Sequence, residues 1–112
     1  MSVVLAPIAE GKVEKWRQWA DDLQNGRAEE FKAFNSRYGL TRHSAWLAET
    51  PAGPVVVALH EGPGADKFMP AVAASDNEFD VWFKERLSEY HNIDLSKPLP
   101  GAPPELVIND VK

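Results

Sequence analysis

The chain has 112 residues, a net charge of −5 at pH 7, 44% hydrophobic residues and no cysteine. This length predicts one domain over residues 1–112, with one hydrophobic core. An acidic chain without a cluster of Lys and Arg argues against nucleic acid and membranes as partners, since both attract cationic surfaces. The absence of cysteine excludes disulfides, thiolate metal ligands and cysteine nucleophiles, and cytoplasm is the default compartment.

The first elements are a short strand and a long aromatic helical segment. Ser2–Ile8 (SVVLAPI) is an apolar run that predicts a strand buried on both faces, and it is too short for a signal peptide or a membrane span. Residues 10–38 carry aromatic side chains at helical spacing. The sequence QNG at 24–26 is a break, so this segment is either one kinked helix or two. The aromatic stripe contains Trp16, Trp19, Phe31 and Phe34.

Residues 42–62 (RHSAWLAETPAGPVVVALHEG) predict a β-hairpin with its turn at TPAGP. We expect Thr50 to pair with Val55, which sets Trp46 opposite Leu59. This face is apolar enough to pack against helices. The other face is too apolar for water and too mixed for a plain core, because it combines His43 and His60 with Ala45, Leu47, Val56 and Ala58.

The second half of the chain predicts a short helix over 65–74 and then a longer one. Ser75 and Glu78 have the spacing of a capping box, which predicts a helix start there. Residues 92–104 form a Pro-rich connection, and 105–110 (ELVIND) predict a last strand. The longer helix presents Phe79, Trp82, Phe83 and Tyr90 on one face.

The element order β-α-β-β-α-β predicts an α+β, ferredoxin-like fold with a four-stranded antiparallel sheet and helices on one face. The face that carries His43 and His60 then has nothing in this chain to cover it. An apolar sheet face of this kind predicts a second copy of the chain, packed face to face as a homodimer.

This pattern resembles the dimeric α+β barrel superfamily over nearly the whole length. Residues 75–95 (SDNEFDVWFKERLSEYHNIDL) are similar to a group of small uncharacterised bacterial proteins within it. The resemblance implies a homodimer with a ligand pocket between each sheet and its helices. The superfamily includes cofactor-free monooxygenases, haem-degrading monooxygenases and muconolactone-isomerase-like enzymes. The first strand here lacks the Asn of the haem-degrading members, which argues against that activity.

His43 and His60 are the candidate catalytic residues, as a general base with its partner. They could also be metal ligands, with Glu49 as a third. Glu49 lies six residues from His43, roughly 20 Å along a strand, so we expect no metal site. Hydrogen bonding at the dimer interface is the favoured role for both imidazoles.

The candidate ligand-binding residues are aromatic or cationic. Trp46 with Arg42 could hold a planar anionic ligand by stacking and charge, if their face lines a pocket. His91 ends the last helix, where a structural cap is the favoured role. An aromatic pocket could also include Trp16, Trp82 and Phe83.

The leading functional prediction is a homodimer that binds a small apolar or aromatic molecule without a cofactor. A cofactor-independent monooxygenase or isomerase is the alternative, and a structural or regulatory interaction module is the third. A filled aromatic core without a cavity would favour the structural role.

Overall fold

The computed structural model describes residues 1–95 and 104–111. The elements in chain order are β1 (Ser2–Pro7), α1 (Val13–Asp21), a π-helical turn (Asp22–Gly26), α2 (Ala28–Arg37), β2 (Arg42–Thr50), β3 (Gly53–Glu61), a 3₁₀ turn (Ala65–Lys67), α3 (Phe68–Ala73) and α4 (Glu78–His91). The α+β class is therefore confirmed. The predicted break at QNG is also present, because the π-helical turn separates α1 from α2.

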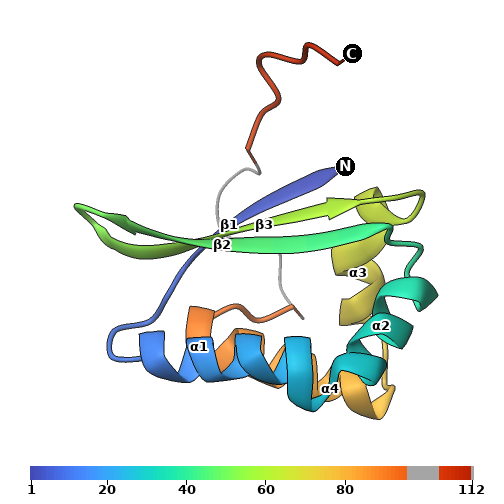
Figure 1. Cartoon of the computed structure of the whole chain (residues 1–112), viewed down its shortest axis with the longest axis horizontal. Coiled ribbons are helices and arrows are strands. Elements are labelled where there is room, and N and C mark those ends of the chain that lie inside the picture. Colours follow the sequence, from blue (N-terminus) through green and yellow to red (C-terminus); the bar gives the residue numbers. More distant parts are fainter. Residues whose placement is uncertain (96–103, 112) are drawn as a thin grey trace.

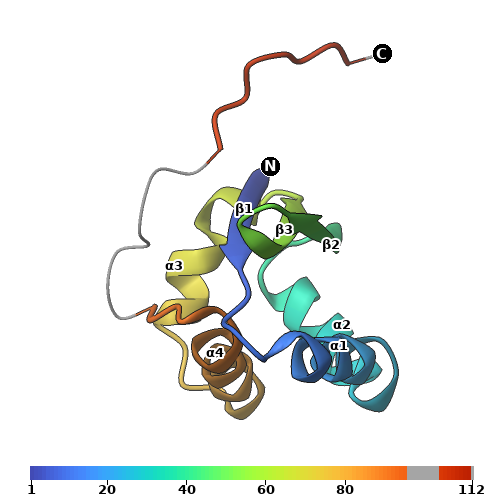
Figure 2. The same ribbon diagram turned by 90° about the vertical axis from the view of Figure 1, so that its left-hand side faces the viewer.

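The strands form an antiparallel sheet in the order β1-β3-β2. The helices lie on one face of this sheet, and the other face carries no helix (Figures 1 and 2). Within the described residues the sheet has three strands, not the predicted four. The segment 104–111 forms no strand and is exposed, because none of the described strands pairs with it.

The register of the hairpin differs from the predicted one by two residues. Thr50 pairs with Gly53 instead of Val55, and His43 stands directly opposite His60. A shift of two residues keeps every side chain on the same face of a pleated strand. The residues predicted to share a face therefore do share it, and the two imidazoles come closer than the predicted diagonal arrangement.

The predicted assignment of the two faces is wrong. His60 and Val56 are only 2% and 4% exposed beneath the helices, whereas Trp46 and Leu5 on the opposite face are 49% and 56% exposed. The prediction that β1 is buried on both faces fails for the same reason. An uncharged imidazole can be buried, so the mixed face packs inside and the more apolar face is left open.

The helix layer has an aromatic core. Phe34 of α2 is fully buried, with its ring centroid 4.8 Å from that of Phe83 in α4 and 5.6 Å from that of Phe68 in α3. The ring centroid of Trp19 in α1 lies 5.1 Å from that of Phe83. These tilted and edge-to-face ring contacts are the favoured arrangements for aromatic pairs, and they join the four helices into one layer.

A buried carboxylate fixes the ends of two helices to each other. Asp80 of α4 is 0% exposed, and it accepts hydrogen bonds from Arg37 at 2.5 Å, Ser75 at 2.7 Å and the Tyr38 hydroxyl. Ser75 is thus not the helix cap that the capping-box spacing predicted. Asn77 caps α4 instead, where its side chain accepts from the backbone N–H of Phe79 at 2.9 Å.

The end of β3 passes close to the chain between α2 and β2, at a point where only glycine fits. Gly62 has a φ of +127°, and a Cβ there would lie 2.3 Å from the carbonyl oxygen of Gly39 and 2.7 Å from the backbone nitrogen of Thr41. This approach fixes the position of the ends of β2 and β3 that carry the two imidazoles.

We predict that Gly62→Ala destabilises the fold more than Gly53→Ala does. Gly53 has a similar φ of +116° but nothing within 4 Å of its Cβ position. Gly53→Ala therefore shows the loss of stability caused by the backbone conformation alone. At position 62 the steric clash should add about 2 kcal/mol to the loss of unfolding free energy. Urea unfolding of both variants measures the difference, and equal losses of stability would contradict the close approach.

Candidate functional site

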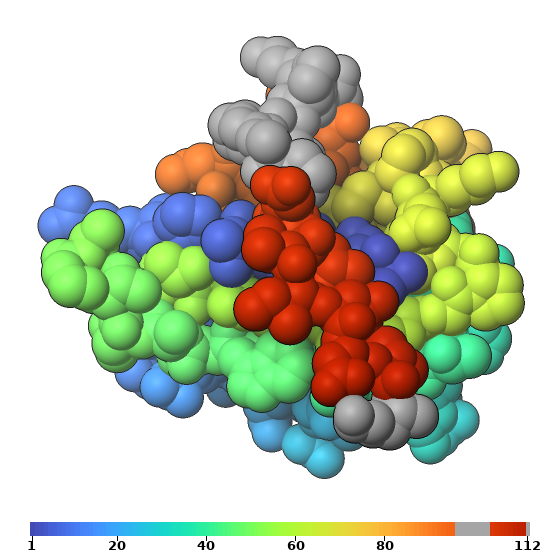
Figure 3. Space-filling view, turned by 90° about the horizontal axis from the view of Figure 1, so that it is seen from above, coloured from blue at the N-terminus to red at the C-terminus, as the bar shows by residue number. Residues whose placement is uncertain are grey.

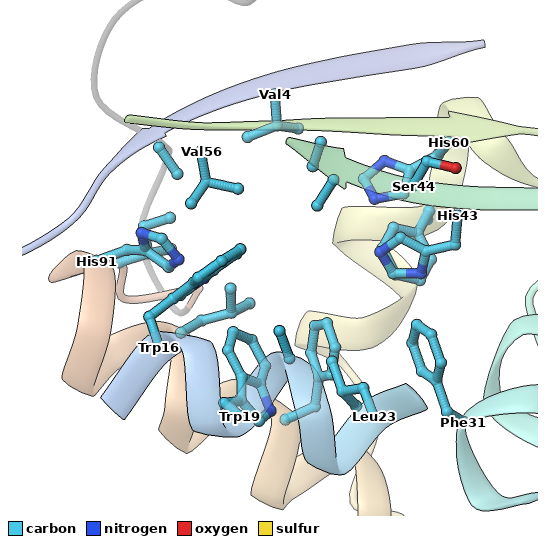
Figure 4. A pocket seen from close by; sticks show the side chains of 18 of the residues that line it. Val4, Trp16, Trp19, Leu23, Phe31, His43, Ser44, Val56, His60 and His91 are labelled. Atoms are coloured by element: carbon cyan, nitrogen blue, oxygen red, sulfur yellow. The ribbon is translucent and has the colours of Figure 1, made fainter. Parts of the chain in front are cut away.

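A cavity of about 430 Å³ lies between the covered face of the sheet and the helix layer (Figure 4). None of its described lining residues is Asp, Glu, Lys or Arg. Its aromatic and aliphatic lining includes Val4, Trp16, Trp19, Leu23, Phe31, Val56, Phe68 and Phe83. The cavity is thus an apolar, uncharged chamber of the kind that holds small organic molecules.

The cavity exists because several side chains on the covered face of the sheet are small and leave space beneath the helices. Ala6, Ala45 and Ala58 project toward the helices from three different strands, and all of them line the cavity. The ring contacts within the helix layer hold the large side chains of the opposite wall, so they do not collapse onto these alanines. The layer of helices and the sheet therefore meet around an open space.

His43 and His60 stand together at one end of this cavity, and both rings project into it (Figure 4). Their ring centroids are 4.6 Å apart, and the ring planes cross at 72°. Nδ1 of His43 lies 2.9 Å from Oδ1 of Asn35 on α2. Nδ1 of His60 is buried without a hydrogen-bond partner among the described residues. Phe68 packs against the His60 ring at 4.5 Å.

Burial keeps both imidazoles uncharged at neutral pH. It lowers the pKa of His60 from 6.5 to about 4, because the imidazolium form would lose its hydration. Burial also lowers the pKa of His43 to about 3, and electrostatic repulsion from the neighbouring His60 adds to this decrease. The predicted general-base pair is therefore present as two neighbouring imidazoles, but as weak bases.

His91 stands at the other end of the cavity (Figure 4). Its Nδ1 donates a hydrogen bond to the carbonyl oxygen of Pro7 at 3.0 Å, which joins the end of α4 to the end of β1. Burial lowers its pKa. Asn92, in the left-handed conformation, ends the helix. His91 thus holds a strand in place and also lines the cavity.

Three of the predicted ligand-binding residues lie outside the cavity. Arg42 and Trp46 are on the open face of the sheet, where the guanidinium carbon lies 5.7 Å from the Trp46 ring centroid. Arg42 also forms an ion pair with Glu61 at 3.3 Å. Trp82 of α4 lies beside α1, with its ring centroid 6.5 Å from that of Trp19 and the Arg27 guanidinium carbon 4.3 Å from its own ring centroid. Trp16 and Phe83 do line the cavity.

Sequence reasoning assigned no site role to several residues that line the cavity or contact its histidines. Phe68 begins the short helix α3 and contacts both imidazole rings. Its ring centroid lies 5.5 Å from that of His43 and 4.5 Å from that of His60. Asn35 orients His43, but it lies on a different element and carries no sequence signal that ties it to that histidine. Gln24 and Leu23 reach the cavity from the π-helical turn, whose geometry the sequence QNG did not reveal.

Within residues 1–95 and 104–111, no three His, Asp or Glu side chains gather in a way that could hold a metal ion. Nor does any helix of the described part have the length and apolar composition needed to cross a membrane.

No protein-family model, curated protein or solved structure matches the chain.

We predict that His60 makes the protein less stable as the pH falls. Its pKa is about 4 in the folded chain and about 6.5 in the unfolded chain. The unfolded state therefore binds more protons between these values, and the native state loses stability as the pH falls through this window. Relative to His60→Gln, the wild type should lose about 2 kcal/mol between pH 7 and pH 5. Urea unfolding at several pH values measures this, and parallel curves would show that His60 is not a buried neutral group.

Proposed function

We propose that this protein binds a small apolar or aromatic molecule in the cavity between its sheet and its helices. The single observation that supports this proposal is the uncharged, aromatic-walled space of about 430 Å³. Ligand pockets have volumes of roughly 300–1,000 Å³, and protein interiors are otherwise close-packed. A molecule of two or three fused rings has a suitable shape for the space between the alanines of the sheet and the rings of the helices.

We further propose that the protein works as a homodimer of the dimeric α+β barrel type, formed through the open face of the sheet. The support is the composition of that face, which contains the exposed Leu5 and Trp46. The register places Val3, Val55, Val57 and Leu59 on the same face. A contiguous apolar face of this kind is uncommon on monomers, and a second copy related by a twofold axis would cover it.

The carboxyl-terminal segment also supports a dimer. Residues 104–111 lie on the side of the sheet away from the helices and in front of the strands when the sheet is viewed from above (Figure 3). Leu106, Val107 and Ile108 are 59%, 80% and 85% exposed. Pairing of 105–110 with a strand in the dimer would bury these side chains and complete the four-stranded, ferredoxin-like sheet.

A second candidate function is that of a cofactor-independent monooxygenase or isomerase. The observation in its favour is the imidazole pair at the end of the cavity, since a neutral imidazole can accept a proton from a bound substrate. A pKa of about 3 for His43 makes it a weak base, which favours binding over proton abstraction. A purely structural or regulatory module is the least supported, because such a role needs no cavity.

We predict that Ala58→Phe abolishes binding of a neutral fluorescent probe, N-phenyl-1-naphthylamine. Ala58 lines the cavity, and a benzyl side chain there would occupy the space of the ligand, so the affinity should fall at least about tenfold. The matched control is Ala52→Phe in the exposed hairpin turn, which should bind the probe as the wild type does. Equal affinities of the two variants would place the binding site elsewhere.

We predict that Trp46→Lys converts the dimer into a monomer. Trp46 lies midway along β2 on the open face, and a lysine there would bury an unpaired charge in the interface. Light scattering should give a mass near twice 12.4 kDa for the wild type and 12.4 kDa for the variant. Ala52→Lys, in the hairpin turn, is the control and should remain dimeric. A monomeric wild type would refute the dimer, and a dimeric Trp46→Lys would refute the assigned face.

A further inference from the structure

The imidazole pair presents hydrogen-bonding atoms of opposite kinds to the cavity. Oδ1 of Asn35 can only accept a hydrogen bond, so Nδ1 of His43, 2.9 Å away, carries the proton. A neutral imidazole has one N–H, and Nε2 of His43 is therefore an acceptor. The hydrogen bond to Asn35 on α2 fixes this tautomer, because a hydrogen bond at one ring nitrogen generally determines which nitrogen carries the proton.

His60 has the opposite tautomer. Its Nδ1 is buried without a partner among the described residues. A buried N–H group without an acceptor is rarer and more costly than a lone pair without a donor. The proton of His60 is therefore on Nε2, which becomes a donor. With the rings 4.6 Å apart and both facing the cavity (Figure 4), one acceptor and one donor stand side by side.

The remaining residues that line the cavity offer no counter-charge to a charged ligand. Apart from the two imidazoles, the described lining has polar groups on Gln24, Ser44 and His91 and the indole N–H groups of Trp16 and Trp19, and none of these groups carries a formal charge at neutral pH. An ionised ligand would lose its hydration without a counter-charge, which is costly in an apolar cavity. A hydroxyl group that both donates and accepts would instead satisfy the two imidazoles together.

We propose that the ligand of this cavity is an uncharged, planar apolar molecule bearing a hydroxyl of the phenol or enol type, held between Nε2 of His43 and Nε2 of His60. This inference rests on the proposed binding function and names the chemistry of its ligand. The hydroxyl donates to His43 and accepts from His60, while the ring system lies against Trp16, Phe31 and Phe83.

The test compares four ligands that share one ring system: naphthalene, 2-methoxynaphthalene, 2-naphthol and 2-naphthoate. Affinities are measured at pH 7.5 by displacement of N-phenyl-1-naphthylamine from the wild-type protein. We expect 2-naphthol to bind at least about tenfold more tightly than naphthalene. The methoxy compound can accept from His60 but cannot donate to His43, so it should bind more weakly than 2-naphthol, and the carboxylate should bind most weakly.

Variants of the imidazoles provide a second, independent readout. In His43→Phe and His60→Phe the preference for 2-naphthol over naphthalene should disappear, while naphthalene still binds and so reports an intact cavity. Glu49→Gln is the control on the same strand as His43, since Glu49 is exposed and outside the lining, and it should keep the preference.

The outcomes separate this inference from the proposed function. Equal binding of naphthalene and 2-naphthol would overturn the hydroxyl site and leave the binding function standing. Tightest binding of 2-naphthoate would also overturn it, in favour of an anion site. If neither the probe nor any of the four ligands binds, both the inference and the proposed function fail.

Discussion

The pairing of β2 with β3 sets His43 directly opposite His60 on the sheet face that the helices cover. Most of the site follows from this placement. The helices and the sheet bury most of both imidazoles, so the pKa values of His43 and His60 fall to about 3 and about 4. Both rings are therefore neutral at physiological pH, and a cavity without charged lining residues remains uncharged throughout.

The cavity stays open because each wall is held independently of a ligand. Asp80 joins the end of α2 to the start of α4, and the aromatic rings of the helices pack on one another. On the other wall, alanines of the covered sheet face leave room that neither layer fills. Rigid walls with a few polar groups at one end are typical of sites that select a ligand by shape and by one hydrogen-bonding group.

The alternation of side chains along the strands predicted which residues share a sheet face. This prediction holds despite a two-residue error in register, because side chains on a strand alternate with a period of two. The alternation could not predict which face the helices cover, since Trp46 and Leu5 look more like core residues than His43 and His60. The last strand at 105–110 has strand composition, but a strand also needs a partner, and composition does not show whether that partner is in the same chain. The site also depends on Ala6 and Ala58, which leave room for the cavity, and on Asn35, which contacts His43. These roles emerge only from three-dimensional packing.

The most direct test of this account is the protonation state of the two imidazoles. Long-range ¹H–¹⁵N correlation spectra of the histidine rings, recorded at pH 7 and pH 5, report both the charge and the position of the proton. The account predicts that His43 is neutral with its proton on Nδ1, and that His60 is neutral with its proton on Nε2, at both pH values. A ring that becomes charged near pH 6.5, or two rings with the same tautomer, would contradict the buried donor–acceptor pair on which the proposed site depends.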